Sequence, residues 1–270
     1  MGVSIHPTAI VSSKAKLEDG VKIDPYSIIR ENVSIGKGTE IGPQVLIEGW
    51  VNIGEDCTIS KGVHIGGLPQ DTHYKGCKSF IKIGNRNLIR EYTTIHRATG
   101  EGNVTQIGDD NFLMAYSHVA HNCKLEDGIV IASFVALAGY VTIEKKAIIG
   151  GITGIHQYVR VGAYSIIGGC SKVIKDIPPY MKADGHPATL WGLNSIGLRR
   201  ANFPPKTRIL LKRAYKILFK SNLNTTEALK KIKKEIDTIQ EIKHLCEFIR
   251  KSQRGISKEK QGNSTFKNEL

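Results

Sequence analysis

The chain has 270 residues, long enough for one or two domains, and its net charge of +13 is concentrated near one end. Five cysteines without a CxxC pair argue against a disulfide framework or a cysteine zinc site. No apolar run is long enough to span a bilayer, and the N-terminus lacks the pattern of a secretory signal. We therefore expect a soluble, cytoplasmic protein without a membrane span.

An aliphatic residue recurs every six positions from Ile5 to Val173. Of the 29 positions on this period, 26 are Ile, Leu or Val, and the exceptions are Asp71, Cys77 and Glu101. A period of six matches neither a helix nor the alternation of a strand. It is typical of a triangular solenoid, in which three short strands make an 18-residue coil and each hexad points one aliphatic side chain inward. Stacked at strand spacing, the coils predict a prism on the order of 45 Å long.

The three exceptions predict where the chain leaves this prism. Two of them lie within residues 68–80 and the third within residues 97–106, and both segments are polar and contain glycine. Because the period returns in phase after each, we expect two projecting loops on a solenoid that covers residues 1–190. Loops on a rigid scaffold are frequent sites of function.

After residue 191 the pattern becomes helical, and we expect an α-helical C-terminal domain over residues 191–254. Residues 255–270 are polar and are expected to be disordered. Residues 192–270 carry 19 Lys and Arg against 7 Asp and Glu, whereas the preceding residues are nearly neutral. This charge predicts either a solvated helical surface or a docking face for an acidic partner. No nucleic-acid-binding motif accompanies it, so we expect no nucleic acid.

Histidines narrow the candidate chemistry. Six of the nine lie between residues 64 and 156, and His118 and His121 lie three residues apart. They could share a metal, but no third ligand is evident, and we expect no metal. They could equally be polar residues at a turn. The third interpretation is a general base, because imidazole titrates near neutrality and can accept a proton from a hydroxyl.

The 18-residue coil supports the general base. It places His121, Gly139 and Gln157 on one ray along the prism. Gly139 would let a substrate approach the backbone, and its N–H could donate to a developing oxyanion.

Nine short segments strengthen this interpretation. They are Pro69-Gln70-Asp71, Ile89-Arg90-Glu91, Thr94-Ile95-His96-Arg97, His118-Val119-Ala120-His121, Leu137-Ala138-Gly139, Gly150-Gly151-Ile152-Thr153, Ile155-His156-Gln157, Gly168-Gly169-Cys170-Ser171 and the stretch from Asn194 to Arg200. With the hexads, they make nearly all of residues 3–250 resemble the bacterial UDP-N-acetylglucosamine acyltransferases of lipid A biosynthesis, a hexapeptide-repeat family.

The resemblance implies a left-handed parallel β-helix followed by a C-terminal α-helical domain, in a homotrimer with active sites between subunits. It implies transfer of a fatty acyl group, usually 3-hydroxylated, from acyl carrier protein to the glucosamine 3-hydroxyl of UDP-N-acetylglucosamine, without a cofactor. The acidic carrier protein would then dock on the basic C-terminal helices.

The resemblance also assigns roles to residues. His121 is implied as the general base, and the N–H of Gly139 as the donor that polarises the thioester carbonyl. Gly169 matches the position that limits acyl-chain length. Substrate binding is implied for Gln70, Asp71, His73, His96, His118, Gln157, Asn194 and Arg200.

Four positions depart from the family pattern. His73 replaces a lysine, Tyr140 a histidine, and Asn122 and Ile196 acidic residues. With Asn122 next to His121, we expect any carboxylate that orients the base to come from elsewhere.

The residues leave three other functions open. One is an N-acyltransferase or a sugar acetyltransferase that uses coenzyme A. Another is a zinc-dependent lyase like the β-helix carbonic anhydrases. The third is a solenoid that binds without catalysis. Neither the acyl-chain length nor the acceptor atom, oxygen or nitrogen, follows from the sequence.

Overall fold

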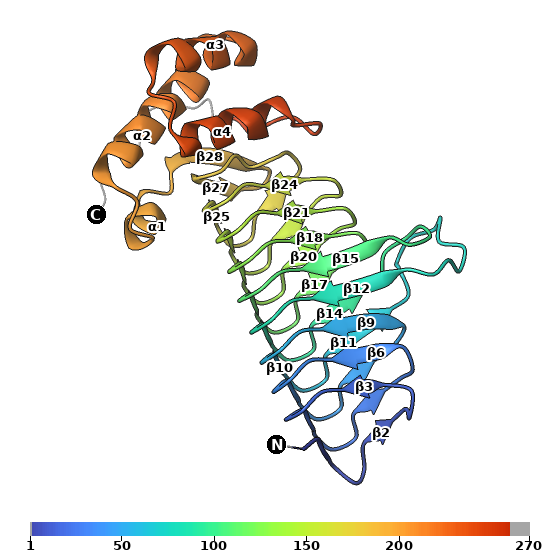
Figure 1. Cartoon of the computed structure of the whole chain (residues 1–270). Coiled ribbons are helices and arrows are strands. Elements are labelled where there is room, and N and C mark those ends of the chain that lie inside the picture. The colour runs from blue at the N-terminus through green and yellow to red at the C-terminus, as the bar shows by residue number, and fades with distance from the viewer. Residues whose placement is uncertain (1, 260–270) are drawn as a thin grey trace.

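The computed structural model describes residues 2–259, most of which wind into a parallel β-helix that carries a helical region at its C-terminal end (Figure 1). Three sheets of short strands form the walls of the helix. Up to β27 (Met181–Gly185), strands pair in parallel with their equivalents in the next coil, whereas β27 and β28 (Ala188–Leu193) pair antiparallel. The β-helix predicted from the six-residue period is therefore confirmed.

We call the three walls sheets A, B and C. Sheet A consists of β1 (Ser4–Ile5), β4 (Lys22–Ile23), β7 (Glu40–Ile41), β10 (Thr58–Ile59), β13 (Leu88–Ile89), β16 (Phe112–Leu113), β19 (Val130–Ile131), β22 (Ile148–Ile149), β25 (Ile166–Ile167), β27 (Met181–Gly185) and β28 (Ala188–Leu193). Sheet B consists of β2 (Ile10–Val11), β5 (Ile28–Ile29), β8 (Leu46–Ile47), β11 (His64–Gly67), β14 (Thr94–His96), β17 (His118–Val119), β20 (Ala136–Leu137), β23 (Gly154–Ile155) and β26 (Lys172–Val173). Sheet C consists of β3 (Lys16–Leu17), β6 (Val33–Ile35), β9 (Trp50–Ile53), β12 (Phe80–Ile83), β15 (Val104–Ile107), β18 (Lys124–Leu125), β21 (Thr142–Ile143) and β24 (Arg160–Val161).

The strand register shows how much chain leaves the prism. Ile47 pairs with Ile65, 18 residues later. Ile65 pairs with Ile95 after 30 residues, and Ile95 with Val119 after 24. The excess over 18 is 12 and then 6 residues, or two hexads and one hexad, in agreement with the missing steps of the period. The two extra segments connect β11 to β12 and β14 to β15, and they project from one side of the prism (Figure 1).

The core is a column of stacked aliphatic side chains. From Ile23 onward, the aliphatic residues on the six-residue period are at most 3% exposed. Each such side chain contributes roughly 1.5–3 kcal/mol through its removal from water. This column holds the backbone of every coil at a set distance from the prism axis, and so it also places the side chains that point outward.

The corners between the sheets have a constant backbone conformation. At most corners the third residue after the inward aliphatic residue lies at positive φ, for example Tyr92 at 57° and Asn122 at 60°. Many of these residues are not glycine, although this conformation costs an ordinary residue roughly 1–2 kcal/mol. Their side chains point outward and stack from coil to coil. The ring centroids of Tyr92 and Tyr116 are 5.2 Å apart, and those of Tyr116 and Phe134 are 4.9 Å apart.

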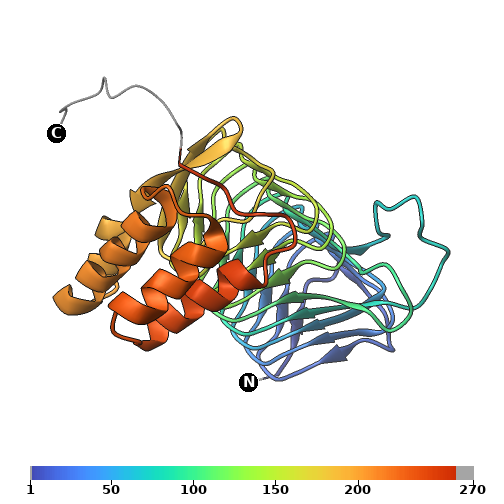
Figure 2. The same cartoon turned by 90° about the horizontal axis from the view of Figure 1, so that it is seen from above.

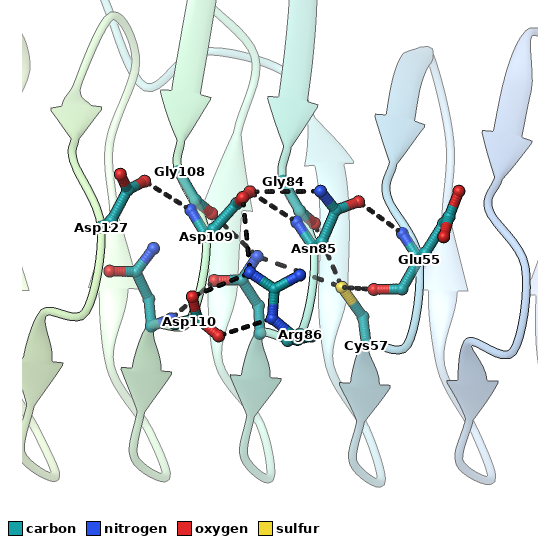
Figure 3. Close-up of polar contacts among 11 residues, drawn as sticks. Glu55, Cys57, Gly84, Asn85, Arg86, Gly108, Asp109, Asp110 and Asp127 are labelled. Atoms are coloured by element: carbon teal, nitrogen blue, oxygen red, sulfur yellow. Dashed lines mark hydrogen bonds and ion pairs between the residues drawn. The ribbon is translucent and has the colours of Figure 1, made fainter.

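A ladder of polar side chains closes the corner between sheets C and A (Figure 3). Oδ1 of Asn85 accepts the N–H of Glu55, Oδ1 of Asp109 accepts that of Asn85, and Oδ1 of Asp127 accepts that of Asp109, each at 2.8 Å. Each of these N–H groups belongs to the second residue after an inward aliphatic residue. It has no hydrogen-bond acceptor on a neighbouring strand within residues 2–259. At this corner the side chain of the next coil satisfies them.

The helical region follows the last strands. It contains α1 (Ser195–Arg200), α2 (Pro205–Phe219), α3 (Thr225–Glu235) and α4 (Gln240–Arg250). Asn224 caps α3, where its side chain and that of Glu227 form a reciprocal capping box. Contacts with the β-helix hold α4 in place: the guanidinium of Arg160 lies 4.1 Å from the ring centroid of Phe248, and the Tyr180 hydroxyl is 2.9 Å from Nδ1 of His244.

The expectation of a disordered segment from residue 255 is wrong for residues 255–259. Ile256 forms a β-bridge with Asp176, Glu259 forms one with Leu190, and Ser257 is 3% exposed. The backbone of the buried Asp176 accounts for part of this order, because its N–H donates to the carbonyl of Gly255 and its carbonyl accepts the N–H of Ser257, each at 2.9 Å. Residues 260–270 lie outside the described residues.

Candidate active site

A groove of about 500 Å³ runs over the outward face of sheet B toward its corner with sheet C. Outward-facing strand residues form its floor, among which Ala136 and Gly154 are small. His118 lies at one end and Lys172 at the other. His121, Gly139 and Gln157 line the groove along the corner, so the ray predicted from the 18-residue coil is present in the structure.

His121 packs directly against Gly139. The residue is only 4% exposed, and a β-carbon added to Gly139 would lie 2.5 Å from both Cε1 and Nε2 of the imidazole. Only glycine leaves room for the ring at this position. The ring of Tyr140 meets the imidazole edge to face, with the centroids 5.3 Å apart.

The other ring nitrogen of His121 faces two polar side chains. Nδ1 is 2.9 Å from Oδ1 of Asn122 and 4.0 Å from Oδ2 of Asp71. The amide of Asn122 therefore makes the direct contact with the ring, and the carboxylate of Asp71, from the first loop, lies farther away. Sequence reasoning missed Asn122 because a neutral side chain was not weighed as the orienting group.

The backbone N–H of Gly139 is free to donate into the groove. Within residues 2–259 it has no hydrogen-bond acceptor. It is the second residue after Leu137, the position that the ladder of Figure 3 serves at another corner. Pro25 and Pro43, which lack an N–H, hold the same position of the hexad at the corner between sheets A and B. The coil therefore forms without a hydrogen bond from this N–H, and no side chain of residues 2–259 accepts the one of Gly139.

Asp71 is fixed by its own loop. Its Oδ1 accepts the backbone N–H of His73 at 2.9 Å and is 3.1 Å from Nδ1 of the His73 ring. The backbone N–H of His73 is the main reason why the pKa of Asp71 lies below its usual value. Asp71 is therefore ionised at neutral pH. Gln70 lines the groove, whereas the side chain of His73 is 89% exposed.

His96 and His118 are neutral histidines beside the groove. Their rings meet edge to face, with the centroids 5.1 Å apart, and Nδ1 of His118 is 2.8 Å from the Thr94 hydroxyl. Burial lowers the pKa of His96 and lowers that of His118 to about 4. They can therefore serve as hydrogen-bonding groups for a polar substrate, but not as cations at neutral pH.

Three residues implied for substrate contacts lie away from the groove. Asn194 caps α1 and donates from Nδ2 to the carbonyl of Tyr164, a residue at the corner between sheets C and A. Arg200 is exposed at the other end of α1. Gly169 is exposed at the corner between sheets A and B. Within one chain these residues do not join His121.

A metal site does not emerge from the geometry. Among residues 2–259, no three His, Cys, Asp or Glu side chains come together in a way that could hold a metal ion. In the same part of the chain, no helix is long and apolar enough to cross a membrane.

Comparisons with known proteins give the family of this chain. A family model for UDP-N-acetylglucosamine O-acyltransferase, domain 2, matches residues 176–257, and a bacterial transferase hexapeptide model matches residues 14–49 and 105–139. An acyl-[acyl-carrier-protein]–UDP-N-acetylglucosamine O-acyltransferase from Thermodesulfovibrio yellowstonii is 51% identical over 253 residues, which cover 93% of this chain and 98% of the relative. The chain belongs to the UDP-N-acetylglucosamine O-acyltransferase family. A Sulfurihydrogenibium member is 47% identical over 95% of both chains.

Solved structures of UDP-N-acetylglucosamine acyltransferases confirm the fold. The Francisella novicida enzyme superposes with a TM-score of 0.91 at 36% identity, over 95% of both chains. The Acinetobacter baumannii protein gives the same TM-score at 40% identity, over 94% of this chain and 99% of that one. A coil of the opposite hand could not superpose over such a length. The left-handed parallel β-helix followed by helices is therefore confirmed, and the chain is an acyltransferase.

Proposed function

We propose that this acyltransferase moves a fatty acyl group, with a 3-hydroxyl in the usual donor, from acyl carrier protein to the glucosamine 3-hydroxyl of UDP-N-acetylglucosamine. One observation supports this proposal above all. The buried imidazole of His121 lies beside the free backbone N–H of Gly139 at the corner of the groove. A base and an oxyanion donor side by side suit attack of a hydroxyl on a thioester.

In this mechanism His121 is the general base. Nε2 takes the proton of the sugar hydroxyl as the oxygen attacks the thioester carbon, so that a C–O bond forms. The carbonyl oxygen becomes an oxyanion and accepts the N–H of Gly139. Collapse of the intermediate breaks the C–S bond, and the imidazolium returns the proton to the leaving thiolate. No redox step and no cofactor enter.

Substrate contacts follow from the surroundings of the groove. We assign Asp71 and Gln70 to the sugar, since both lie on the first loop at the end of the groove that holds His121. His73, His96, His118 and Gln157 supply further hydrogen-bonding groups there. Arg200 provides a permanently charged, forked donor that suits a diphosphate, and Asn194 begins the same short helix.

Asn194, Arg200 and Gly169 fit this scheme if a neighbouring subunit supplies them, which is why the proposal includes a homotrimer with sites between subunits. The helical region with α1 lies on the side of the prism opposite to the projecting loops (Figures 1 and 2). A ladder of exposed apolar side chains along the corner between sheets A and B suits burial against another subunit: Tyr92, Tyr116, Phe134 and Ile152 are 42–65% exposed. Gly169 continues along this corner and would limit the length of the acyl chain.

The acidic carrier protein would dock on the helical region. Lys230, Lys231, Lys233 and Lys234 of α3 are all exposed. None of them forms an ion pair with a carboxylate in the described part of the chain. Unpaired cations on the helical region would steer an acidic partner toward it.

Mass spectrometry of the reaction product tests the proposal. The protein is incubated with UDP-N-acetylglucosamine and a panel of acyl carrier proteins, with acetyl-coenzyme A in a parallel reaction. The expected product carries one acyl group that mild base removes, as an ester requires. Transfer from acetyl-coenzyme A at an equal rate, or a base-stable amide product, would favour the coenzyme A-dependent or N-acyl alternatives.

A further inference from the structure

We propose that Asn122 is a positioning residue that sets the tautomer of His121. The backbone of Thr99 holds the Asn122 amide with Oδ1 toward His121, so the imidazole carries its hydrogen on Nδ1 and presents a bare Nε2 to the groove. This inference rests on the proposed function only where it concerns catalysis. The tautomer itself is a property of the protein alone.

The amide of Asn122 has one permitted orientation. Its Oδ1 accepts the N–H of Thr99 at 2.8 Å, and its Nδ2 donates to the carbonyl of Thr99 at 3.1 Å. A backbone N–H can only donate and a carbonyl can only accept, so exchange of the amide oxygen and nitrogen would break both bonds. The identity of the atom that faces His121 is thereby fixed as oxygen.

Thr99 itself is held in the second loop. Its carbonyl also accepts Nδ2 of Asn103 at 2.8 Å. The backbone N–H of Asn122 donates to the Thr105 hydroxyl at 2.9 Å, which secures the other side of the contact. Residues near both ends of the projecting segment therefore contact Asn122, Thr99 at its side-chain amide and Thr105 at its backbone N–H, and this gives the second loop a function in the site.

The tautomer follows from the fixed oxygen. Oδ1 of Asn122 is 2.9 Å from Nδ1 of His121 and can only accept, so Nδ1 must donate. A neutral imidazole with its hydrogen on Nδ1 has a lone pair on Nε2. Nε2 is the nitrogen beside Gly139, where a substrate hydroxyl would meet it.

The amide of Asn122 selects the tautomer of His121 without placing a negative charge in contact with the ring, as a carboxylate would. The carboxylate of Asp71 is 4.0 Å from Nδ1. The titratable groups that face the ring are Asp71 from the first loop, Tyr140 from the corner, and His96 and His118 from sheet B.

Nitrogen-15 NMR of histidine-labelled protein tests the tautomer directly, at a pH where the ring is neutral. The wild type should show His121 with a protonated Nδ1 and an unprotonated Nε2. In Asn122→Ala this preference should weaken or reverse. The proposal is overturned if the wild type carries the hydrogen on Nε2, or if the variant keeps the wild-type pattern. This readout stands even if the protein fails to use UDP-N-acetylglucosamine, in which case only the proposed function falls.

Kinetics test the consequence. Asn122→Ala should lower kcat about tenfold or more, a part of the contribution of a general base, with a nearly unchanged KM for the nucleotide sugar. Asn32→Ala is the matched control, because Asn32 is a corner residue at φ 62° against 60° for Asn122 and lies in an early coil. It should keep full activity. Wild-type kcat in Asn122→Ala would overturn the catalytic role.

A conservative variant separates positioning from packing. Asn122→Asp keeps an acceptor toward Nδ1, so it should retain more activity than Asn122→Ala. If Asn122→Asp is as inactive as Asn122→Ala while both remain folded, a positioning role for the acceptor oxygen is wrong.

Discussion

The imidazole of His121 occupies the space that a side chain on Gly139 would need. A β-carbon at Gly139 would lie 2.5 Å from Nε2, closer than real contacts permit. The two residues are 18 positions apart and adjoin because the coils stack in register. One contact therefore joins the candidate base to the candidate oxyanion donor.

Gly139→Ala should displace the imidazole from the groove. Because the neighbouring coil backbone is fixed by the core, the ring is the part that moves. We expect a fall in turnover on the order of a hundredfold, comparable to the loss of a general base, with little change in melting temperature. Steady-state kinetics and thermal unfolding measure the two effects, and full activity would show that the ring tolerates the added methyl group.

His121→Ala should lower turnover by roughly 10² or more, because it removes the general base. Circular dichroism should show a retained fold, since the aliphatic column does not include this side chain. His6→Ala is the control: it also removes an imidazole, but from the exposed first coil. Near-normal turnover in His121→Ala would remove His121 from the mechanism.

Asp71→Asn should lower kcat/KM for the nucleotide sugar. The carboxylate lies 4.0 Å from Nδ1 of His121, so its loss removes a negative charge beside the proposed imidazolium as well as a proposed sugar contact. We expect a fall of about tenfold, the scale of a charged hydrogen bond, in steady-state kinetics with an unchanged melting temperature. An unchanged kcat/KM would separate Asp71 from the site.

His118 should make stability depend on pH. Its pKa falls from 6.5 in the unfolded chain to about 4 in the folded protein. Between these values the unfolded chain binds a proton that the folded protein does not, so the unfolding free energy should fall as the pH falls from 6.5 to 4. His118→Gln should flatten this dependence in denaturant titrations. An equally steep dependence in the variant would assign it to another group.

Mixed trimers should reveal a site shared between subunits. His121→Ala and Arg200→Ala are each expected to be impaired, the second mainly in nucleotide-sugar binding. If Arg200 comes from a neighbouring subunit, unfolding and refolding the two variants together should regenerate some sites with both residues intact. Recovered activity above the sum of the separate variants supports the shared site, whereas no recovery places both residues in one chain.

The spacing of aliphatic residues was enough to predict the coil, its 18-residue register and the ray shared by His121, Gly139 and Gln157. This succeeded because a solenoid is built from contacts between adjacent coils, and each hexad repeats the same local arrangement. The two loops were also predictable, since only the insertion of whole hexads lets the period return in phase.

Contacts that do not follow the six-residue period could be found only in the tertiary structure. Thr99 reaches Asn122 across 23 residues of chain, through a loop whose path follows no repeat. The sequence predicted that any carboxylate orienting His121 comes from elsewhere. In the structure the Asn122 amide, held in one orientation, makes the direct contact with the ring, and the Asp71 carboxylate is 4.0 Å away. The position of α1 likewise depends on packing at the end of the prism. Local periodicity therefore determines the frame that presents the candidate base, and non-repeating contacts determine which of its nitrogens carries the hydrogen.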